Sequence, residues 1–383
     1  MIRVLPLLLL AFLLGGCGLF QKDNTEPPAE LVDIEASLEV DERWSRDTGA
    51  GSDEYYLHLR PFLLGGTLYV ADAKGRVGAY DAENGKPLWS VSLDTPLTGG
   101  VSGNDDVIVV GSGRGEAIAL RRDTGVELWR TRLTSEVLSL SEVELGFVVA
   151  RTNDGKLHAL AAGSGELVWQ AGRNTPALSL RGAGRPMMAF GAVVAGFDNG
   201  KLAAFSLERG NTLWETTVAA PSGQSELDRM VDLDGDMALV GETLYVASYQ
   251  GRVTAISLRE GRILWARDLS SYAGLAADSR YVYVSDEVDA VWALDRFNGA
   301  TLWRQDKLRL RAISAPAVVG DVLAVGDYEG YLHWLRQSDG AFVARNRVDN
   351  AAIRVTPVVD GATAYVLSTR GELGAVAVGG NAP

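Results

Sequence analysis

Short runs of β-branched and aromatic residues, separated by turn residues, recur along most of the chain. Clear examples are Thr67–Ala71, Asp106–Val110, Thr243–Ala247 and Tyr281–Ser285, whose composition favours strands. Turn pairs such as Lys74-Gly75 supply the positive backbone dihedral angles that tight hairpins need. No stretch after residue 35 has a helical period of useful length. The pattern therefore predicts an all-β protein made of short antiparallel strands.

One unit of sequence is repeated along the chain. It begins at Gly75, continues through a strand to a turn glycine at Gly85, and ends in Leu-Trp at Trp89. The repeat starts again at Gly115, Gly155, Gly200, Gly251, Asp289, Gly330 and Gly371. From Trp89 to Trp303 the repeat tryptophans are 40, 40, 45, 51 and 38 residues apart, which is the length of one propeller blade. We therefore expect an eight-bladed β-propeller with four antiparallel strands per blade, with seven blades as the alternative.

The two ends of the repeat region complete each other. The last repeat stops at Gly371–Val378 without its Leu-Trp strand, whereas Trp44 stands alone after Val40 near the start. An open ring would leave exposed strand edges. We expect the N-terminal strand to close the last blade.

Seven of the nine tryptophans occupy one repeat position, and an alanine recurs at the position predicted to lie opposite. An indole buries about 150 to 250 Å² of apolar surface, and such regularity favours packing between blades over a ligand-stacking site. The predicted structural tryptophans are Trp44, Trp89, Trp129, Trp169, Trp214, Trp265 and Trp303. The opposing small residues are Ala79, Ala119, Ala159, Ala204, Ala255, Ala293 and Ala375.

The N-terminus has the features of an export signal. A cationic start is followed by the apolar run Val4–Leu14, which is too short to span a bilayer as a helix. It ends in Leu-Gly-Gly before Cys17, the single cysteine of the chain, and resembles the lipobox of bacterial lipoproteins. We expect a signal peptide over 1–16, a lipidated Cys17 and flexible tether over 17–34, and the propeller over 35–383. The alternative is an ordinary secreted protein cut nearby.

Composition narrows the chemistry. The chain has 36 Lys and Arg against 49 Asp and Glu, a net charge of −13, which argues against a nucleic-acid binder. A lone cysteine and three scattered histidines do not predict a metal site. The run Gly111–Gly115 has the wrong spacing for a phosphate loop. We expect no catalytic residues, no metal and no cofactor.

The run Asp232-Leu-Asp234-Gly-Asp236 resembles the start of a calcium-binding loop. Its glycine comes too early, and Thr243 stands where a bidentate glutamate is needed. An acidic loop on the surface is the better prediction.

The longest spacings reveal two insertions, Asn174–Met188 and Ala219–Met237. Both lie between the tryptophan strand of one blade and the first strand of the next, so they share one face of neighbouring blades. Insertions of this kind usually map to the binding face. Leu178, Leu180 and Arg181 have the composition of an interface hot spot, although the leucines could also begin an inner strand. The spacing from Trp44 to Trp89 is also 45 residues, which leaves room for a third loop near Tyr55 and Tyr56.

Taken together, these motifs resemble the BamB family of outer-membrane β-barrel assembly lipoproteins over essentially the whole chain. The resemblance rests on the lipobox, the eight repeats, Ser179–Gly182, Leu227–Arg229 with Asp232 and Asp234, and Gly326–Trp334. It implies a non-enzymatic scaffold subunit of the BAM complex, lipid-anchored in the outer membrane and facing the periplasm. It also implies binding to the periplasmic POTRA domains of BamA, support of barrel assembly and insertion, and unfolded outer-membrane proteins as further partners. The partner-binding residues it implies are Leu178, Leu180, Arg181, Asp232 and Asp234.

Two other functions remain open from the sequence. Quinone (PQQ)-dependent dehydrogenases share the repeat, but they are longer and commonly place adjacent cysteines and calcium-binding carboxylates at the cofactor. A glycan-binding propeller would gather aromatic side chains at one pocket. The sequence does not place Tyr55, Tyr56, Tyr249 and Tyr272 well enough to decide.

Overall fold

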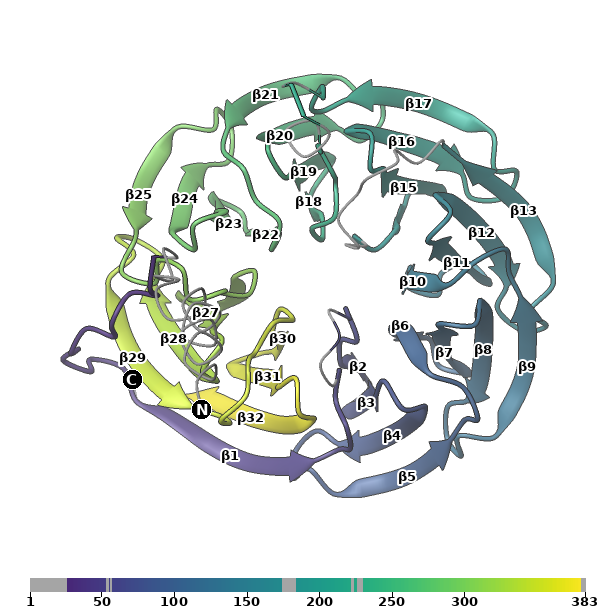
Figure 1. The fold of residues 1–383 in the computed structure, drawn as a ribbon, viewed down its shortest axis with the longest axis horizontal. Coiled ribbons are helices and arrows are strands. Elements are labelled where there is room, and N and C mark those ends of the chain that lie inside the picture. The colour runs from purple at the N-terminus through teal and green to yellow at the C-terminus, as the bar shows by residue number, and fades with distance from the viewer. Residues whose placement is uncertain are drawn as a thin grey trace, which may run out of the picture.

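Eight four-stranded sheets stand around a central axis like the blades of a propeller (Figure 1). The computed structural model describes residues 26–52, 55, 57–173, 184–221, 224–225 and 230–379. All regular elements in these ranges are strands, β1 to β32. The prediction of an all-β propeller with eight blades of four antiparallel strands is confirmed.

Each blade is numbered along the chain, and its strands run from the centre of the ring outward. Blades 1 and 2 contain β2 (Phe62–Leu64), β3 (Thr67–Ala71), β4 (Arg76–Asp81), β5 (Pro87–Ser92), β6 (Leu97–Gly103), β7 (Val107–Ser112), β8 (Glu116–Arg121) and β9 (Glu127–Arg132). Blades 3 and 4 contain β10 (Val137–Leu140), β11 (Phe147–Thr152), β12 (Lys156–Ala161), β13 (Leu167–Gly172), β14 (Met187–Ala189), β15 (Ala192–Gly196), β16 (Lys201–Ser206) and β17 (Thr212–Thr217).

The second half of the ring repeats this plan. Blades 5 and 6 contain β18 (Ala238–Val240), β19 (Thr243–Ala247), β20 (Arg252–Ser257), β21 (Ile263–Asp268), β22 (Leu275–Ala277), β23 (Tyr281–Ser285), β24 (Val291–Asp295) and β25 (Thr301–Gln305). Blades 7 and 8 contain β26 (Ala317–Val319), β27 (Val322–Gly326), β28 (Tyr331–Arg336), β29 (Phe342–Arg347), β30 (Val358–Asp360), β31 (Thr363–Leu367), β32 (Glu372–Val378) and β1 (Val40–Asp47).

Blade 8 is made from both ends of the chain. Its strand order is β1-β32-β31-β30, and β1 pairs antiparallel with β32 from Val40 opposite Val378 to Asp47 opposite Glu372. The N-terminal strand therefore forms the outer strand of the last blade, as the unfinished final repeat predicted.

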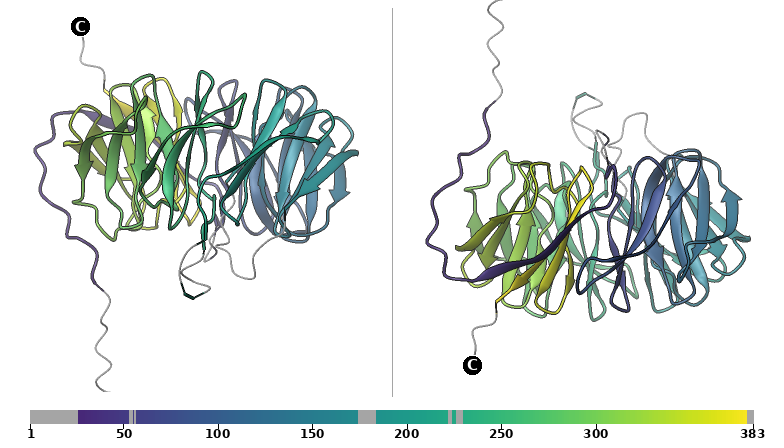
Figure 2. Two further views of the ribbon diagram at one scale, coloured as in Figure 1. Left: turned by 90° about the horizontal axis from the view of Figure 1, so that it is seen from above. Right: turned by 90° about the horizontal axis from the view of Figure 1, so that it is seen from below.

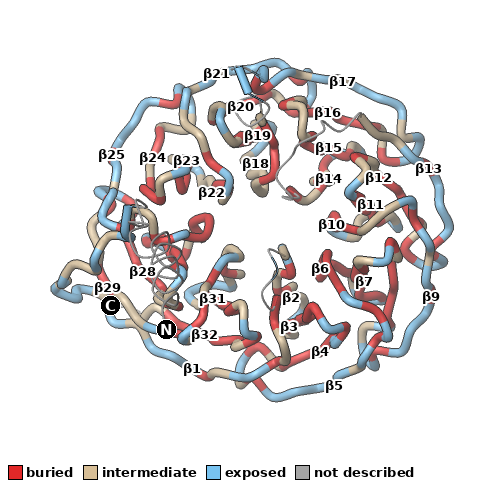
Figure 3. The backbone as a smooth tube through the Cα atoms, in the orientation of Figure 1, coloured by how far each residue is buried: buried red, intermediate tan, exposed pale blue. Residues whose placement is uncertain are grey.

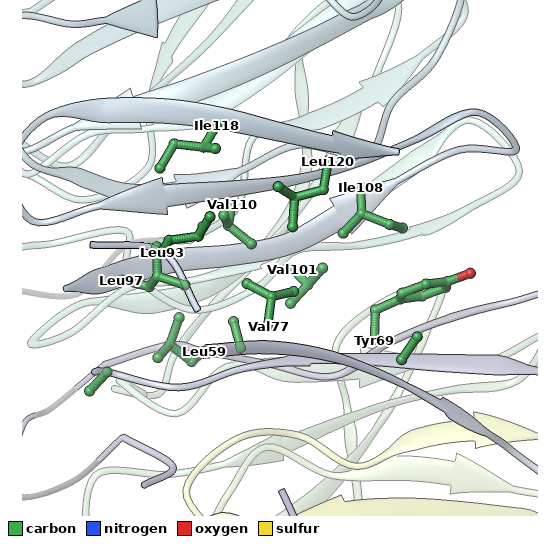
Figure 4. Packing of buried hydrophobic residues seen from close by; sticks show 13 residues of the cluster. Leu59, Tyr69, Val77, Leu93, Leu97, Val101, Ile108, Val110, Ile118 and Leu120 are labelled. Atoms are coloured by element: carbon green, nitrogen blue, oxygen red, sulfur yellow. The ribbon is translucent and has the colours of Figure 1, made fainter. Parts of the chain in front are cut away.

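The core lies between the blades. The two middle strands of each blade are largely buried, most inner strands are half-buried, and the outer strands form a more exposed rim (Figure 3). At the junction of blades 1 and 2, Tyr69 and Val77 from one sheet pack with Ile108 and Ile118 from the next (Figure 4). Short β-branched runs that are apolar on both faces are the sequence form of strands buried between two layers, so each blade depends on its neighbours for stability.

Each repeat tryptophan stands on an outer strand and docks on the following blade. Trp129 donates from Nε1 to the carbonyl oxygen of Ala162 at 2.8 Å. Its ring lies against Gly165, where an added Cβ would be 2.5 Å from the indole, so only glycine leaves room for it. The carbonyl acceptors for the other six tryptophans, in chain order from Trp44, are Ala82, Arg122, Leu207, Leu258, Arg296 and Gln337. One hydrogen bond and one ring contact thus recur at seven of the eight junctions.

Residues 26–39, here called the N-terminal segment, run along the outside of blade 7 (Figure 2). Arg311 donates to the carbonyl of Ala29, and Arg345 donates to the carbonyl of Val32, at 2.9 and 3.0 Å. The two arginines belong to a buried network with Asp327 and His333. The expected tether over 17–34 is described only from Glu26 onward, and that part differs from a free tether because the propeller already binds it.

Candidate functional site

The three longest connections between blades emerge on one face. Every connection from an outer strand to the next inner strand leaves the same face of the ring, here called the loop face. The longest of these connections are 48–61, 173–186 and 218–237. The described ends of the two insertions and of the third connection therefore lie on the same face of the ring. Leu178, Leu180 and Arg181 lie outside the described residues.

Asp236 ties these three connections together. Its carboxylate forms an ion pair with Arg60 at 2.6 Å and lies 3.5 Å from Nε of Arg185. The backbone N–H of Arg185 donates to the other carboxylate oxygen at 3.3 Å. Arg60 precedes β2 and Asp236 precedes β18, in blades 1 and 5, which are opposite one another in the ring (Figure 1). The ion pair therefore bridges the centre of the propeller at the loop face.

The charge state of Asp236 follows from these partners. Burial alone would raise its pKa, but the guanidinium groups of Arg185 and Arg60 outweigh that effect and lower the pKa to about 2. Arg60 is itself held by its backbone, which donates to the carbonyl of Gly100 and accepts from Val101 at 3.0 and 3.1 Å. The carboxylate is therefore ionised at neutral pH. It binds groups from two other connections and holds the three connections together at the loop face.

Asp232 and Asp234 are buried, so the expectation of an acidic surface loop at these residues is wrong. Their exposed fractions are 0% and 4%. The chain between them inserts Leu233 into the core at the junction of blades 4 and 5, and the carbonyl of Asp232 accepts from Tyr249 N–H at 3.0 Å. Val231 and Leu233, which alternate with the aspartates, are buried in the core, so the aspartates between them are buried as well.

Asp234 sits in a buried charge network between blades 3 and 4. It lies 3.8 Å from Arg151, which also pairs with Asp198. Burial raises the pKa of Asp234 well above its ordinary value, and the Arg151 guanidinium only partly opposes this. Partner contact by Asp232 and Asp234 stays a prediction, and their burial favours a role in supporting the loop.

Sequence reasoning missed Arg60, Arg185 and Asp236 as a group. Asp236 lies in the acidic run that the sequence had singled out, but its ion-pair partner Arg60 is 176 residues away. The signal that could have found the pair is the blade count, because connections separated by four repeats must face each other across an eight-bladed ring.

Other candidate chemistry is dispersed. His158 is buried beside Thr134 and Thr152 in blade 3, whereas His333 is buried in blade 7. Gly111 and Ser112 end β7, and residues 113–115 form the turn that leads into β8. Within the described ranges, no group of three or more His, Cys, Asp or Glu side chains is arranged to hold a metal. The part of the chain that the structure describes also holds no helix long and apolar enough to cross a membrane.

The aromatic residues considered for a glycan site come from several connections of the described chain. Tyr55 and Tyr272 are exposed, but they belong to connections that lead into blades 1 and 6. The hydroxyl of Tyr272 donates to Asp289 at 3.3 Å. Tyr56 lies outside the described residues.

Comparison with known proteins decides the family. A family model described as outer membrane protein assembly factor BamB matches residues 73–305. The chain belongs to the BamB family. The BamB of Pseudomonas aeruginosa is 43% identical over 367 residues, which cover 96% of each chain. The BamB of Yersinia pestis is 36% identical over 359 residues, which cover 91% of each chain.

Solved structures agree with this assignment. The crystal structure of BamB from Moraxella catarrhalis has a TM-score of 0.81 at 27% identity, covering 88% of this chain and 100% of that one. A quinohemoprotein alcohol dehydrogenase from Comamonas testosteroni has a TM-score of 0.67 at 13% identity, covering 90% of this chain and 77% of that one. The second likeness is one of fold alone. The similarity to quinone-dependent enzymes is thus the shared propeller, whereas the BamB relatives are named as assembly factors.

Proposed function

We propose that this protein is a non-enzymatic scaffold subunit of the outer-membrane β-barrel assembly (BAM) complex and binds the periplasmic POTRA domains of BamA through its loop face. The partner-binding residues in this proposal are Leu178, Leu180 and Arg181, with Asp232 and Asp234 supporting the loops from beneath. A scaffold of this kind supports assembly and insertion of β-barrel proteins by holding its partner in one arrangement.

One observation carries the proposal: the three long connections gather on one face of a BamB-family propeller, and Asp236 fixes them to one another. Arg60, Arg185 and Asp236 come from three different connections. Preorganised loops bind with a smaller entropy cost than loops that must order on contact. Membership in a family of assembly factors supplies the identity of the partner complex.

The proposal includes a lipid anchor at Cys17 after removal of residues 1–16, which would hold the protein at the outer membrane facing the periplasm. Stable anchoring takes more than one acyl chain, because a single chain gives only marginal binding. The N-terminal segment supports this geometry: Glu26 pairs with Arg309, on the connection between blades 6 and 7. That connection belongs to the loop face, so the described chain begins beside that face.

Calorimetric titration tests the scaffold function. The mature chain without lipid is titrated into the purified POTRA segment of BamA, and the titration is repeated with Leu180→Ala combined with Arg181→Ala. We expect saturable binding by the unaltered protein and loss of binding in the double variant. Circular dichroism and the melting temperature of the variant should equal those of the unaltered protein.

The matched control is Leu145→Ala, because Leu145 is exposed in the turn before β11, away from the loop face. This variant should bind as the unaltered protein does. Absence of binding by the unaltered protein would refute the scaffold function. Binding that survives the double change would move the interface away from residues 180 and 181.

A further inference from the structure

The N-terminal segment is held on blade 7 in two different ways. In its second half, two backbone N–H groups donate to the carbonyl oxygen of Val343 at 2.9 and 3.1 Å, and backbone groups do not titrate. In its first half, residues 26–34, the carbonyl oxygens of Ala29 and Val32 accept from the side chains of Arg311 and Arg345. No residue of 26–34 is fully buried, so limited apolar contact and a few hydrogen bonds hold this half in place.

Arg345 is in direct contact with His333, a buried residue of β28. Nδ1 of His333 is 3.0 Å from Nε of Arg345, and its Nε2 is 2.9 Å from the carboxylate of Asp327. Both His333 and Asp327 have an exposed fraction of 0%. The imidazole also packs against the rings of Tyr331 and Phe342, whose centroids are 6.2 and 6.0 Å away. A buried histidine therefore positions one of the two arginines that bind the segment.

The hydrogen-bond partners of His333 determine its charge. A guanidinium group contains only donors, so Nδ1 of the imidazole must accept from Arg345 and carries no proton. The single ring proton of the neutral form is then on Nε2, facing the carboxylate of Asp327. The same carboxylate oxygen accepts from Nε of Arg311 at 2.9 Å. Both arginines therefore have their partners while His333 is neutral.

A second proton on His333 would break this arrangement. The proton would sit on Nδ1 and face the N–H of Arg345, so that two donors and two positive charges would be 3.0 Å apart. Like charges at this distance in a buried site repel strongly. Arg345 would have to turn away, and the carbonyl of Val32 would lose its donor.

The docked structure favours the neutral form of His333. Burial is the main cause of a pKa below the ordinary 6.5, because it penalises the charged ring. Asp327 opposes this effect, whereas the guanidinium groups of Arg345 and Arg311 add to it. Undocking of the first half would free Arg345 from Val32 and admit water to the site. Both changes would make a second proton on the ring less costly.

Other charged groups around the site act on the two arginines. Glu329 pairs with Arg311, and the negative charge of Asp33, in the docked segment, favours the charged form of Arg345. Both carboxylates keep the guanidinium groups charged, which maintains the conflict with a protonated imidazole. By element, the titratable and charged groups of the site are Asp327 and Glu329 in the turn after β27, Tyr331 on β28, Arg345 and Arg347 on β29, Arg311 between blades 6 and 7, and Asp33 in the segment.

We propose that His333 releases the first half of the N-terminal segment from blade 7 when it takes up a proton, and that this half docks again when the imidazole becomes neutral. Since the docked form has the lower histidine pKa, the undocked form binds the proton more tightly. Docking is therefore fully favoured above a pH of about 6.5 and weakens progressively as the pH falls below that value.

Release would change the length of the tether, a consequence that rests on the lipid anchor of the proposed function. Residues 26–34 are nine residues, and an extended chain spans at most about 3.3 to 3.6 Å per residue. Their release would add roughly 30 Å to the reach of the anchor. The charge of His333 would thus set how far the propeller can stand from the membrane.

A distance measurement between two spin labels tests the release. The mature chain from residue 18 onward has no cysteine. Glu30→Cys and Ser338→Cys therefore place one label on the segment and one on the turn between β28 and β29, both at exposed positions. Pulsed electron paramagnetic resonance records the distance distribution at pH 8, 7, 6 and 5. The ratio of a broad, released population to a narrow, docked one should rise at least about five-fold from pH 8 to pH 5, and should fall again on return to pH 8.

Three variants separate His333 from other titrating groups. His333→Gln keeps a donor for Asp327 and an acceptor for Arg345 but cannot take up a proton, so its distribution should stay narrow down to pH 5. Arg345→Met removes the guanidinium that a protonated imidazole would repel, so its ratio should be the same at pH 8 and pH 5. The matched control is His158→Gln in blade 3, where burial lowers the histidine pKa to about 4. This control should respond to pH as the unaltered protein does.

A distribution that stays narrow in the unaltered protein at pH 5 would overturn the proposal, and so would a pH response that persists in folded His333→Gln. If circular dichroism shows that this variant does not fold, Arg345→Met decides. Loss of its pH response supports the release, and an undiminished response overturns it. The measurement contains no POTRA domain, so a pH response in a protein that does not bind POTRA domains would support the release and refute the scaffold alone.

Discussion

Trp334 and Ala344 form a cross-strand pair in blade 7 in which the two residue types are exchanged relative to the other seven blades. Elsewhere the alanine is on the third strand and the tryptophan is on the outer strand, as in Ala119 opposite Trp129. The usual indole docks on the turn between the third and outer strands of the next blade. Blade 8 has no such turn, because its third and outer strands are the two ends of the chain. In blade 7 the indole is therefore on the third strand, β28, and its N–H donates to the Asn346 side chain of the outer strand β29 at 2.8 Å.

Restoring the common order in blade 7 should therefore destabilise the protein. Trp334→Ala combined with Ala344→Trp keeps the side-chain volume of the pair but deprives the indole N–H of its Asn346 partner. A buried donor without a partner costs about 1 to 3 kcal/mol, so the melting temperature should fall. Trp334→Ala alone should fall further, because it also leaves a cavity. A double variant with the same melting temperature as the unaltered protein would contradict this account.

Truncating a docked repeat tryptophan should have a large effect. Trp129→Ala removes the ring contact with Gly165 and the hydrogen bond to Ala162, and should cost about 3 to 5 kcal/mol of unfolding free energy. The neighbouring exposed Leu128→Ala is the control, and surface changes of this kind usually stay within about 0.5 kcal/mol. Chemical denaturation of both variants measures the difference. Equal midpoints would show that the indole is not a packing element.

Asp236 should contribute stability that depends on pH. Its pKa falls from an ordinary 3.8 to about 2 in the folded protein. A depressed carboxyl pKa contributes stability that is fully present above the ordinary value and is lost as the pH falls through about 2. The contribution is on the order of 2 kcal/mol. Melting curves of Asp236→Asn between pH 2 and 7 should lie below those of the unaltered protein at neutral pH and converge with them at acid pH.

Asp234→Asn should behave in the opposite way. The pKa of Asp234 is raised in the folded protein, so folding favours its protonated form, and the charged form costs stability as the pH rises above the ordinary value. An amide cannot ionise. The variant should therefore gain stability relative to the unaltered protein between pH 4 and 7, as measured by thermal unfolding. A loss that grows with pH would mean that the ion pair with Arg151 outweighs burial.

Arg311 should hold the N-terminal segment on blade 7. It joins buried Asp327, at 2.8 Å, to the carbonyl of Ala29. Arg311→Ala leaves the Asp327 charge without that partner, which costs about 3 to 5 kcal/mol for a buried pair. Limited proteolysis should then cut between residues 26 and 34 before it cuts the blades. Glu26→Gln removes only an exposed ion pair and should leave the cleavage pattern unchanged. Early cleavage in that variant would mean that the ion pair between Glu26 and Arg309, and not Arg311, keeps the segment bound.

The repeat made the blades predictable because each strand obeys local rules. Strand composition, turn glycines and the spacing of tryptophans such as Trp89 and Trp129 depend on residues within one unit, and the missing outer strand after Val378 pointed directly to the strand around Trp44. Because these features recur in every blade, a strand that is ambiguous in one repeat can be assigned from the corresponding strand of the other repeats.

The centre of the loop face could not be predicted in the same way. Arg60 and Asp236 meet only because eight blades close into a ring, and no local pattern relates them. The burial of Asp232 and Asp234 also escaped, since acidic residues in a long connection usually face solvent. Their apolar neighbours Val231 and Leu233 are the sequence signal for this burial, because both side chains enter the core.

The closure of blade 8 sets an order in time for making this protein. The strand that leaves the ribosome among the first has its partner among the last, because Val40 pairs with Val378. Such a long sequence separation makes ring closure a late event in folding. A chain interrupted before residue 372 has no β32 for β1 to pair with, so completed synthesis is a condition for a closed ring.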